Sequence, residues 1–229
     1  MKIAAKSVLA AWLLLVLSAP WAGAASEARA QGSERGGEEV LKELLDGNAR
    51  YVEGKPAGKD LGSGRRRELG KGQHPKAVVL GCSDSRVPPE HVFDQRLGDL
   101  FVVRLAGNVP EPAAIGSVEY AVEHLGTRLV VVLGHRHCGA VKAALSGGRV
   151  EGNIGAIVKE IAPAVSAARK TTKPGADLED AAVHENARRA ARALTQRSAI
   201  LRRLVAEETV RIAVAVYDLD TGRLELEHD

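Results

Sequence analysis

The fold is decided by Ala77-Val78-Val79-Leu80-Gly81-Cys82-Ser83-Asp84-Ser85-Arg86, in which a short apolar run leads directly into reactive side chains. Four apolar residues before a glycine are typical of a strand that is buried on both faces of a sheet. A second apolar run, Leu129 to Leu133, also ends at a glycine and leads into His135-Arg136-His137-Cys138. Open parallel sheets place their sites just beyond the carboxyl ends of strands, so both clusters are expected at one edge of a sheet.

Helical and extended patterns alternate around these two runs, as they do in βαβ units. Helices are predicted over 38–51, 63–71, 113–125, 151–169 and 178–206, and another from about Cys138. Strands are predicted over 77–80, 100–104, 129–133 and 210–217, followed by the turn Asp220-Thr221-Gly222 and an edge strand with Leu224 and Leu226. The sequence therefore predicts an α/β fold with a mostly parallel central sheet, flanking helices and an antiparallel C-terminal edge strand.

The N-terminal segment has the pattern of a secretory signal peptide. Lys2 and Lys6 precede the apolar run 8–17, and small residues at 22–24 form a cleavage site, with a second one at 28–30. We therefore expect a signal peptide over 1–24, or to residue 30, and a periplasmic or secreted protein. An uncleaved anchor is the alternative. A disordered start over 25–37 would precede a single domain at 38–229, with no membrane span after cleavage.

The charge balance argues against nucleic acid as a partner. The chain has 32 Lys and Arg residues against 29 Asp and Glu residues, a formal net charge of +3. Loss of Lys2 and Lys6 with the signal peptide would lower this charge of +3 by two, to +1. A nucleic-acid-binding protein needs a clear basic excess, which this chain lacks.

Potential metal ligands gather in the two clusters. Cys82 and Cys138 are the only cysteines of the chain, and Asp84 and His135 lie beside them. Two thiolates, an imidazole and a carboxylate make a tetrahedral donor set that suits Zn²⁺. Two alternatives remain open at this point: a disulfide between the cysteines, and His137 as the ligand in place of His135.

Several stretches together resemble the β-class carbonic anhydrases over about residues 38–228. They are Gln73-His74-Pro75-Lys76, the segment 82–90 beginning Cys82-Ser83-Asp84-Ser85-Arg86, Gly98-Asp99-Leu100-Phe101-Val102-Val103-Arg104, Ala106-Gly107-Asn108, Glu119-Tyr120-Ala121, Gly134-His135 and Cys138-Gly139-Ala140-Val141. The resemblance implies zinc as cofactor and reversible hydration of carbon dioxide to bicarbonate and a proton by a zinc-bound hydroxide.

The resemblance also assigns roles at the metal. Cys82, His135 and Cys138 would be the constant zinc ligands. Asp84 would either occupy the fourth position or turn away to pair with Arg86, so that the Asp84–Arg86 dyad gates the metal. A catalytic zinc needs one position open to water, whereas a site closed by four protein ligands is structural.

The same resemblance implies a substrate pocket formed by Gln73, Phe101, Ala106, Tyr120 and Gly139. Gln73 would hydrogen-bond the substrate, the next three residues would line an apolar pocket for carbon dioxide, and the Gly139 amide would help to hold bicarbonate. Some of these groups would come from a neighbouring subunit, which implies a homodimer or a dimer of dimers. Without the resemblance, Phe101 and Tyr120 would be interpreted as ordinary core residues.

Two other functions fit the same ligands. One is hydrolysis of carbonyl sulfide or carbon disulfide, which are linear analogues of carbon dioxide. The other is a non-enzymatic zinc-binding protein with a closed four-ligand site, although such a site would need neither Gln73 nor Arg86.

Overall fold

The computed structural model describes residues 36–58, 61–148 and 150–227. The helices are α2 (Gly37–Val52), α3 (Ser63–Leu69), α4 (Pro89–Val92), the 3₁₀ turn η1 (Ala106–Asn108), α5 (Pro112–His124), α6 (Gly139–Ser146), α7 (Ile154–Thr171), α8 (Leu178–Arg197) and α9 (Ala199–Ala206). The strands are β1 (Ala77–Gly81), β2 (Leu100–Arg104), β3 (Leu129–His135), β4 (Arg211–Tyr217) and β5 (Leu224–Leu226).

These strands form one sheet in the order β2-β1-β3-β4-β5. The first four are parallel, and β5 runs antiparallel to the end of β4. The predicted α/β fold with its antiparallel edge strand is therefore confirmed. Strand β2, which follows β1 in the sequence, pairs with one side of β1, and the next strand, β3, pairs with its other side. The carboxyl ends of β1 and β3 thus flank a topological switch point, where open α/β sheets bind their ligands.

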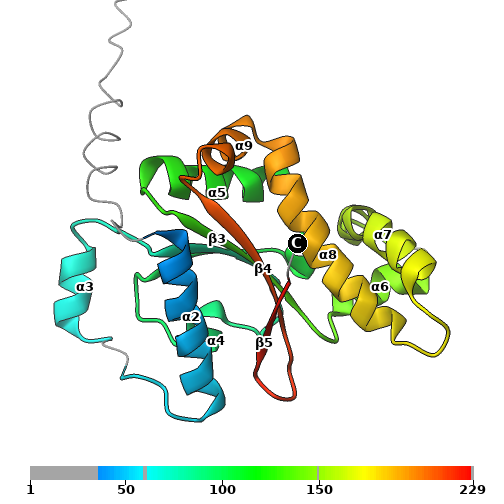
Figure 1. Ribbon diagram of the computed structural model, residues 1–229, viewed down its shortest axis with the longest axis horizontal. Helices are drawn as coiled ribbons and strands as arrows, with labels where there is room; N and C mark the ends of the chain where they lie inside the picture. The colour runs from blue at the N-terminus through cyan, green and yellow to red at the C-terminus, as the bar shows by residue number, and fades with distance from the viewer. Residues whose placement is uncertain (1–35, 59–60, 149, 228–229) are drawn as a thin grey trace, which may run out of the picture.

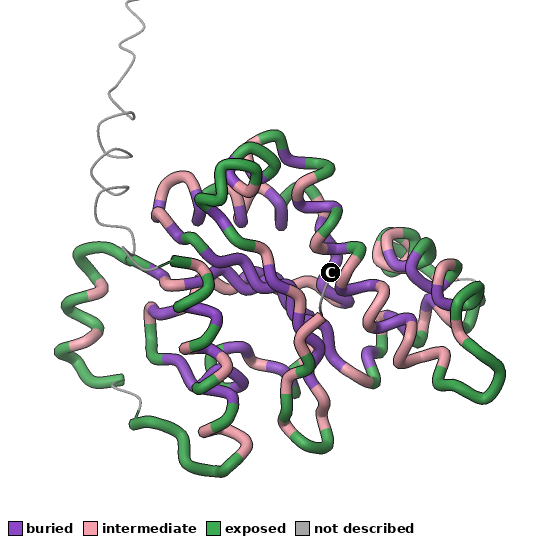
Figure 2. Tube along the Cα trace, in the orientation of Figure 1, coloured by how far each residue is buried: buried purple, intermediate pink, exposed green. Residues whose placement is uncertain are grey.

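Helices cover both faces of the sheet (Figure 1). Alternate residues of the central strands point to opposite faces, so that Val78 and Val130 join one apolar cluster while Val79 and Val131 join the other. Helix α2 and the short α4 pack on the second face, and α5, α8 and α9 pack on the first. Strands β1 and β3, at the centre of the sheet, are accordingly buried along their whole length (Figure 2).

The predicted helix over 178–206 is wrong in one respect, because it is two helices. Ser198 is extended (φ −116°, ψ 118°) and ends α8, and its Oγ accepts a hydrogen bond from the Leu201 amide at the start of α9. A serine that caps a helix in this way satisfies an otherwise unpaired amide. The apolar spacing continues through the break because both helices bury leucines, such as Leu194 and Leu204, against the same cluster.

The signal peptide and residues 25–35 of the predicted disordered start lie outside the described residues. Helix α2 begins at Gly37, directly after Gly36. Among the helices of residues 36–227 that the structure describes, none combines the length and the hydrophobicity that crossing a bilayer would require.

Candidate metal centre

Three potential ligands lie at the switch point because two neighbouring strands end there. β1 and β3 are paired in register, with Gly81 opposite Leu133. Cys82 is the first residue after β1, and His135 is the last residue of β3. Cys138 follows a short turn and is the N-cap of α6. The strand order, rather than any local motif, therefore brings together residues that are more than fifty positions apart in sequence.

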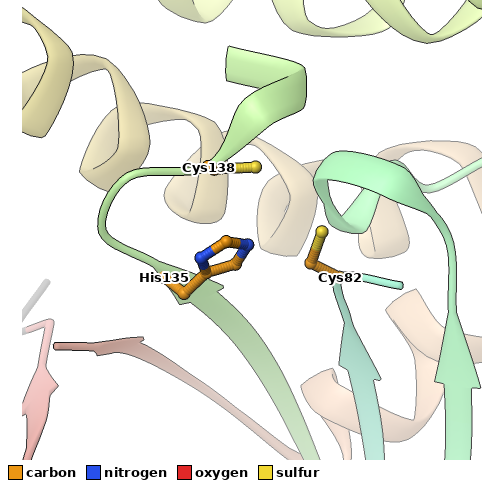
Figure 3. Close-up of side chains that lie close together, drawn as sticks. All are labelled: Cys82, His135 and Cys138. Carbon is orange, nitrogen blue, oxygen red and sulfur yellow. The ribbon is translucent and has the colours of Figure 1, made fainter. Parts of the chain in front are cut away.

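The ligand atoms of Cys82, His135 and Cys138 all lie within 4.8 Å of one another (Figure 3). Donors of a tetrahedral zinc site with bonds of about 2.0–2.3 Å lie roughly 3.5–3.8 Å apart, so this group fits a single zinc ion. All three residues are buried, and His135 Nε2 has no hydrogen-bond partner in the described part of the chain. A buried nitrogen without a partner is costly, and a metal ion at this point would satisfy it.

The same geometry bears on the two alternatives for these residues. Both cysteines are free, buried thiols. The ring of His137 is half exposed, and its Nδ1 lies 3.3 Å from Glu179 Oε1, away from the cysteines. His137 has a positive φ of 55°, which turns the chain so that Cys138 rather than His137 joins the buried group.

Cys82 is surrounded by groups that favour its thiolate. The pKa of Cys82 lies well below its ordinary value, because the neighbouring Cys138 and His135 side chains and the Gly107 amide together outweigh the effect of burial. The Gly107 N–H donates to Cys82 Sγ over 3.2 Å. The neighbouring negative charge on Cys82, together with burial, raises the pKa of Cys138. A second thiolate therefore needs a cation close by, as a metal ion would provide.

Asp84 is paired with Arg86. Arg86 Nε donates to Asp84 Oδ1 over 2.9 Å, and Nη2 donates to Oδ2 over 2.8 Å. This bidentate pair holds the pKa of Asp84 well below its usual range. Asp84 Oδ2 nevertheless lies only 3.8 Å from His135 Nε2, so the carboxylate stays close to the three donors.

The residues of the implied substrate pocket fall into two groups. Ala106, in η1, and Gly139, the first residue of α6, adjoin Gly107 and Cys138 at the carboxyl end of the sheet. Gln73 is exposed and precedes β1, and Phe101 pairs with Val78 near the start of β2, so both lie toward the amino end of the sheet.

Tyr120 belongs with this second group. It lies on α5, is 44% exposed, and its ring centroid is 6.3 Å from that of Phe101. Tyr120 is therefore not the buried core residue that its type alone would suggest. Within one chain, the second group is separated from the metal donors.

Several supporting residues were missed by sequence reasoning. Arg104 donates through its guanidinium to the carbonyls of Cys82 and Asp84 and so holds the loop after β1. Asn186, from α8, donates to the Gly107 carbonyl and fixes the turn whose amide contacts Cys82. Gly107 has a φ of +69°, and a Cβ there would approach Ile161 Cδ1 to 2.6 Å. The glycine between Ala106 and Asn108 was the one local signal of this turn.

Comparison with known proteins agrees with this site. The family model for "Carbonic anhydrase" matches residues 77–224. A carbonic anhydrase of Mycolicibacterium smegmatis is 46% identical over 81% of this chain and 90% of its own length. Carbonic anhydrase 2 of Mycobacterium tuberculosis is 42% identical over 80% of this chain and 88% of its own length.

Solved structures extend the agreement to the fold. A tetrameric β-carbonic anhydrase from Sordaria macrospora superposes with a TM-score of 0.64 and 25% identity, over 72% of this chain and 86% of the other. On the evidence of sequence, fold and ligand group together, the chain belongs to the β-class carbonic anhydrases.

Proposed function

We propose that this carbonic anhydrase holds one zinc ion on Cys82, His135 and Cys138 and uses it to hydrate carbon dioxide reversibly. The single observation that carries the proposal is the buried convergence of two thiols and one imidazole nitrogen. When bound, zinc lowers the pKa of a water ligand from 15.7 toward about 7 and so supplies a hydroxide nucleophile at neutral pH.

The Asp84–Arg86 pair would keep the site catalytic. Both oxygens of Asp84 are engaged by Arg86. This would leave three protein donors for the metal and one position for water. Asp84 would still be close enough to accept a hydrogen bond from a group at that position. If Arg86 released it, the carboxylate would be able to approach the metal and close the site. The dyad would therefore act as a gate.

A second copy of the chain would complete the substrate pocket. Support comes from the exposed Tyr120 with its partner Phe101, and from β2, which is the outer strand of the sheet on that side. Gln73 is exposed at the same end of the sheet. We propose a homodimer, or a dimer of dimers, in which these three residues reach the metal site of the neighbouring subunit and contact carbon dioxide or bicarbonate.

We also propose that the enzyme is exported and works in the periplasm or outside the cell. The proposal rests on the signal-peptide pattern at the N-terminus. Fractionation of cells that express the full chain tests it. The processed protein is expected in the exported fraction, and an unprocessed protein in the cytoplasm would contradict it.

The function is tested by stopped-flow hydration kinetics on purified protein whose zinc content is measured in the same sample. Zinc-loaded protein is expected to accelerate hydration, with the rate rising with pH as the active site loses a proton. Carbonyl sulfide and carbon disulfide are assayed under the same conditions. Faster turnover of either analogue than of carbon dioxide would favour the hydrolase alternative. Bound zinc without any acceleration would contradict the enzymatic proposal.

A further inference from the structure

Arg136 lies between His135 and Cys138 in the sequence, and its guanidinium contacts three carboxylates. Its Nε lies 3.1 Å from Asp180 Oδ1, on α8. Its Nη1 lies 3.3 Å from Asp218 Oδ2, just after β4, and its Nη2 lies 3.1 Å from Glu225 Oε2, on β5. Each of the three guanidinium nitrogens thus contacts a carboxylate from a different element. We call this group the Arg136 clamp.

Two of the three acidic residues of the clamp make further hydrogen bonds. Asp218 Oδ1 accepts hydrogen bonds from the amides of Asp220 and Thr221, both over 2.9 Å. The Asp180 amide donates to the side chain of Asp177, the N-cap of α8. The clamp therefore connects the loop after β3 to rigid parts of the fold that do not contribute a metal ligand.

The main chain of Arg136 sets the orientation of the His135 ring. His135 Nδ1 lies 2.9 Å from the Arg136 carbonyl oxygen, and in the tautomer that donates there, Nε2 is free to bind a metal. The Arg136 amide donates in turn to the Tyr217 carbonyl over 2.9 Å. A shift of Arg136 would therefore turn the imidazole as well as move the loop.

The loop contains a backbone conformation that depends on its surroundings. His137 adopts a positive φ of 55°, which only a small minority of non-glycine residues adopt, although histidine, asparagine and aspartate are enriched among them. Apart from the clamp, the Arg86 guanidinium reaches the His137 carbonyl oxygen over 3.3 Å from the opposite side. The loop that carries His135 and Cys138 is thus held on one side by the dyad arginine and on the other by Arg136.

We infer that Arg136 is a positioning residue for the metal centre, which fixes His135 and Cys138 so that a bound zinc ion is released slowly. This inference rests on the proposed zinc function. Its structural alternative is a surface ion-pair network that contributes to the stability of the fold and does nothing for the metal. Partly exposed ion pairs of that kind contribute little to the free energy of unfolding. A positioning role would change the rate of zinc release, whereas a surface network would not.

The experiment compares zinc transfer from the loaded full-length protein to an excess of a chromophoric chelator in three variants. Arg136→Ala removes the clamp, and Arg136→Lys keeps the charge but reaches fewer carboxylates than the planar guanidinium. Arg203→Ala is the matched control, because Arg203 also bridges two carboxylates, those of Glu123 and Glu207, at similar exposure but away from the site.

Zinc release is expected to be about 10–100-fold faster in Arg136→Ala, the usual effect of losing a group that orients a ligand, and intermediate in Arg136→Lys. Release from Arg203→Ala should match that of the unsubstituted protein. Thermal unfolding of the zinc-free proteins separates the alternatives further. Lower stability of zinc-free Arg136→Ala with unchanged zinc release would overturn the inference. Absence of zinc from the unsubstituted protein would instead refute the proposed function.

Discussion

The two ends of the central sheet differ in how complete they are within one chain. At the carboxyl end, Cys82, His135 and Cys138 converge, are buried and are supported by hydrogen bonds from several elements. At the amino end, Phe101 and Tyr120 contact each other, and Tyr120 remains 44% exposed. It follows that the candidate metal donors come together within the fold of one chain, whereas the proposed substrate pocket is the part that a second chain would complete.

The largest effect is expected from removing a metal donor. Cys82→Ser, His135→Ala and Cys138→Ser should each abolish stoichiometric zinc binding and reduce hydration to the uncatalysed rate, because two remaining protein donors cannot hold the ion as three do. Metal analysis and stopped-flow hydration measure both effects. The matched control is His137→Asn, since asparagine tolerates a positive φ. Loss of zinc in this control but not in His135→Ala would reverse the ligand assignment.

Hybrid dimers test whether the two ends of the sheet act together across a subunit interface. Gln73→Ala should weaken substrate binding without affecting zinc, and Cys82→Ser should remove zinc without affecting the pocket. If Gln73 acts across the interface, differently tagged chains that are co-expressed and purified as hybrids should regain activity, because one of their two sites is intact.

Either variant purified alone serves as the control for that experiment. Hybrids that are no more active than the Gln73→Ala protein would show that Gln73 serves its own chain. Failure to recover any hybrid would contradict the dimer.

A smaller effect on the hydration rate is expected from substitutions in the Asp84–Arg86 pair. Asp84→Asn weakens the pair with Arg86 and should lower the hydration rate about 10–100-fold while zinc content stays at one ion per chain, as for other groups that act on a metal ligand from outside. Arg86→Ala should lower the rate as well, because a released Asp84 is free to close the site. Loss of zinc from Asp84→Asn would mean that the carboxylate is a fourth ligand rather than part of a gate.

Much of the fold was predictable because it depends on local patterns. The apolar runs 77–80 and 129–133 have the composition of buried strands, and their ends placed Cys82 and His135 correctly. The break at Ser198 was not predictable, because the apolar spacing of one helix runs on into the next. The cap at Ser198 acts through a single hydrogen bond, and such a bond does not change the spacing of the apolar residues.

The supporting contacts of the site were also beyond a single sequence. Arg136 meets Asp180, Asp218 and Glu225, which are distant in sequence and come from different elements. Charged residues are common on every protein surface, so their presence in the sequence does not indicate which of them contact one another. Which chain supplies Gln73 is likewise a property of an assembly, and no pattern within one chain encodes it.

The smallest effect is expected near the C-terminal edge strand. Burial raises the pKa of Glu227, but hydrogen bonds and charges from His184 and Arg188 more than offset this, so the net shift is downward. A carboxylate with a lowered folded-state pKa stabilises the protein above its unfolded value, near 4.5, and this contribution is lost as the pH falls through the folded value.

Glu227→Gln should therefore lower the unfolding midpoint modestly at pH 7 and lose this difference below about pH 4. Thermal unfolding across that range measures it. A difference in the unfolding midpoint that grows as the pH falls would contradict a lowered pKa for Glu227. Zinc release should stay unchanged in Glu227→Gln, since Glu227 is not one of the carboxylates that contact Arg136.

Zinc X-ray absorption on the purified protein, with metal content measured in the same sample, tests the proposed metal centre most directly. One zinc per chain is expected, with two sulfur neighbours at about 2.3 Å and two nitrogen or oxygen neighbours at about 2.0–2.1 Å. A chain that binds no zinc, or zinc with fewer than two sulfur neighbours, would contradict a centre built on Cys82, His135 and Cys138.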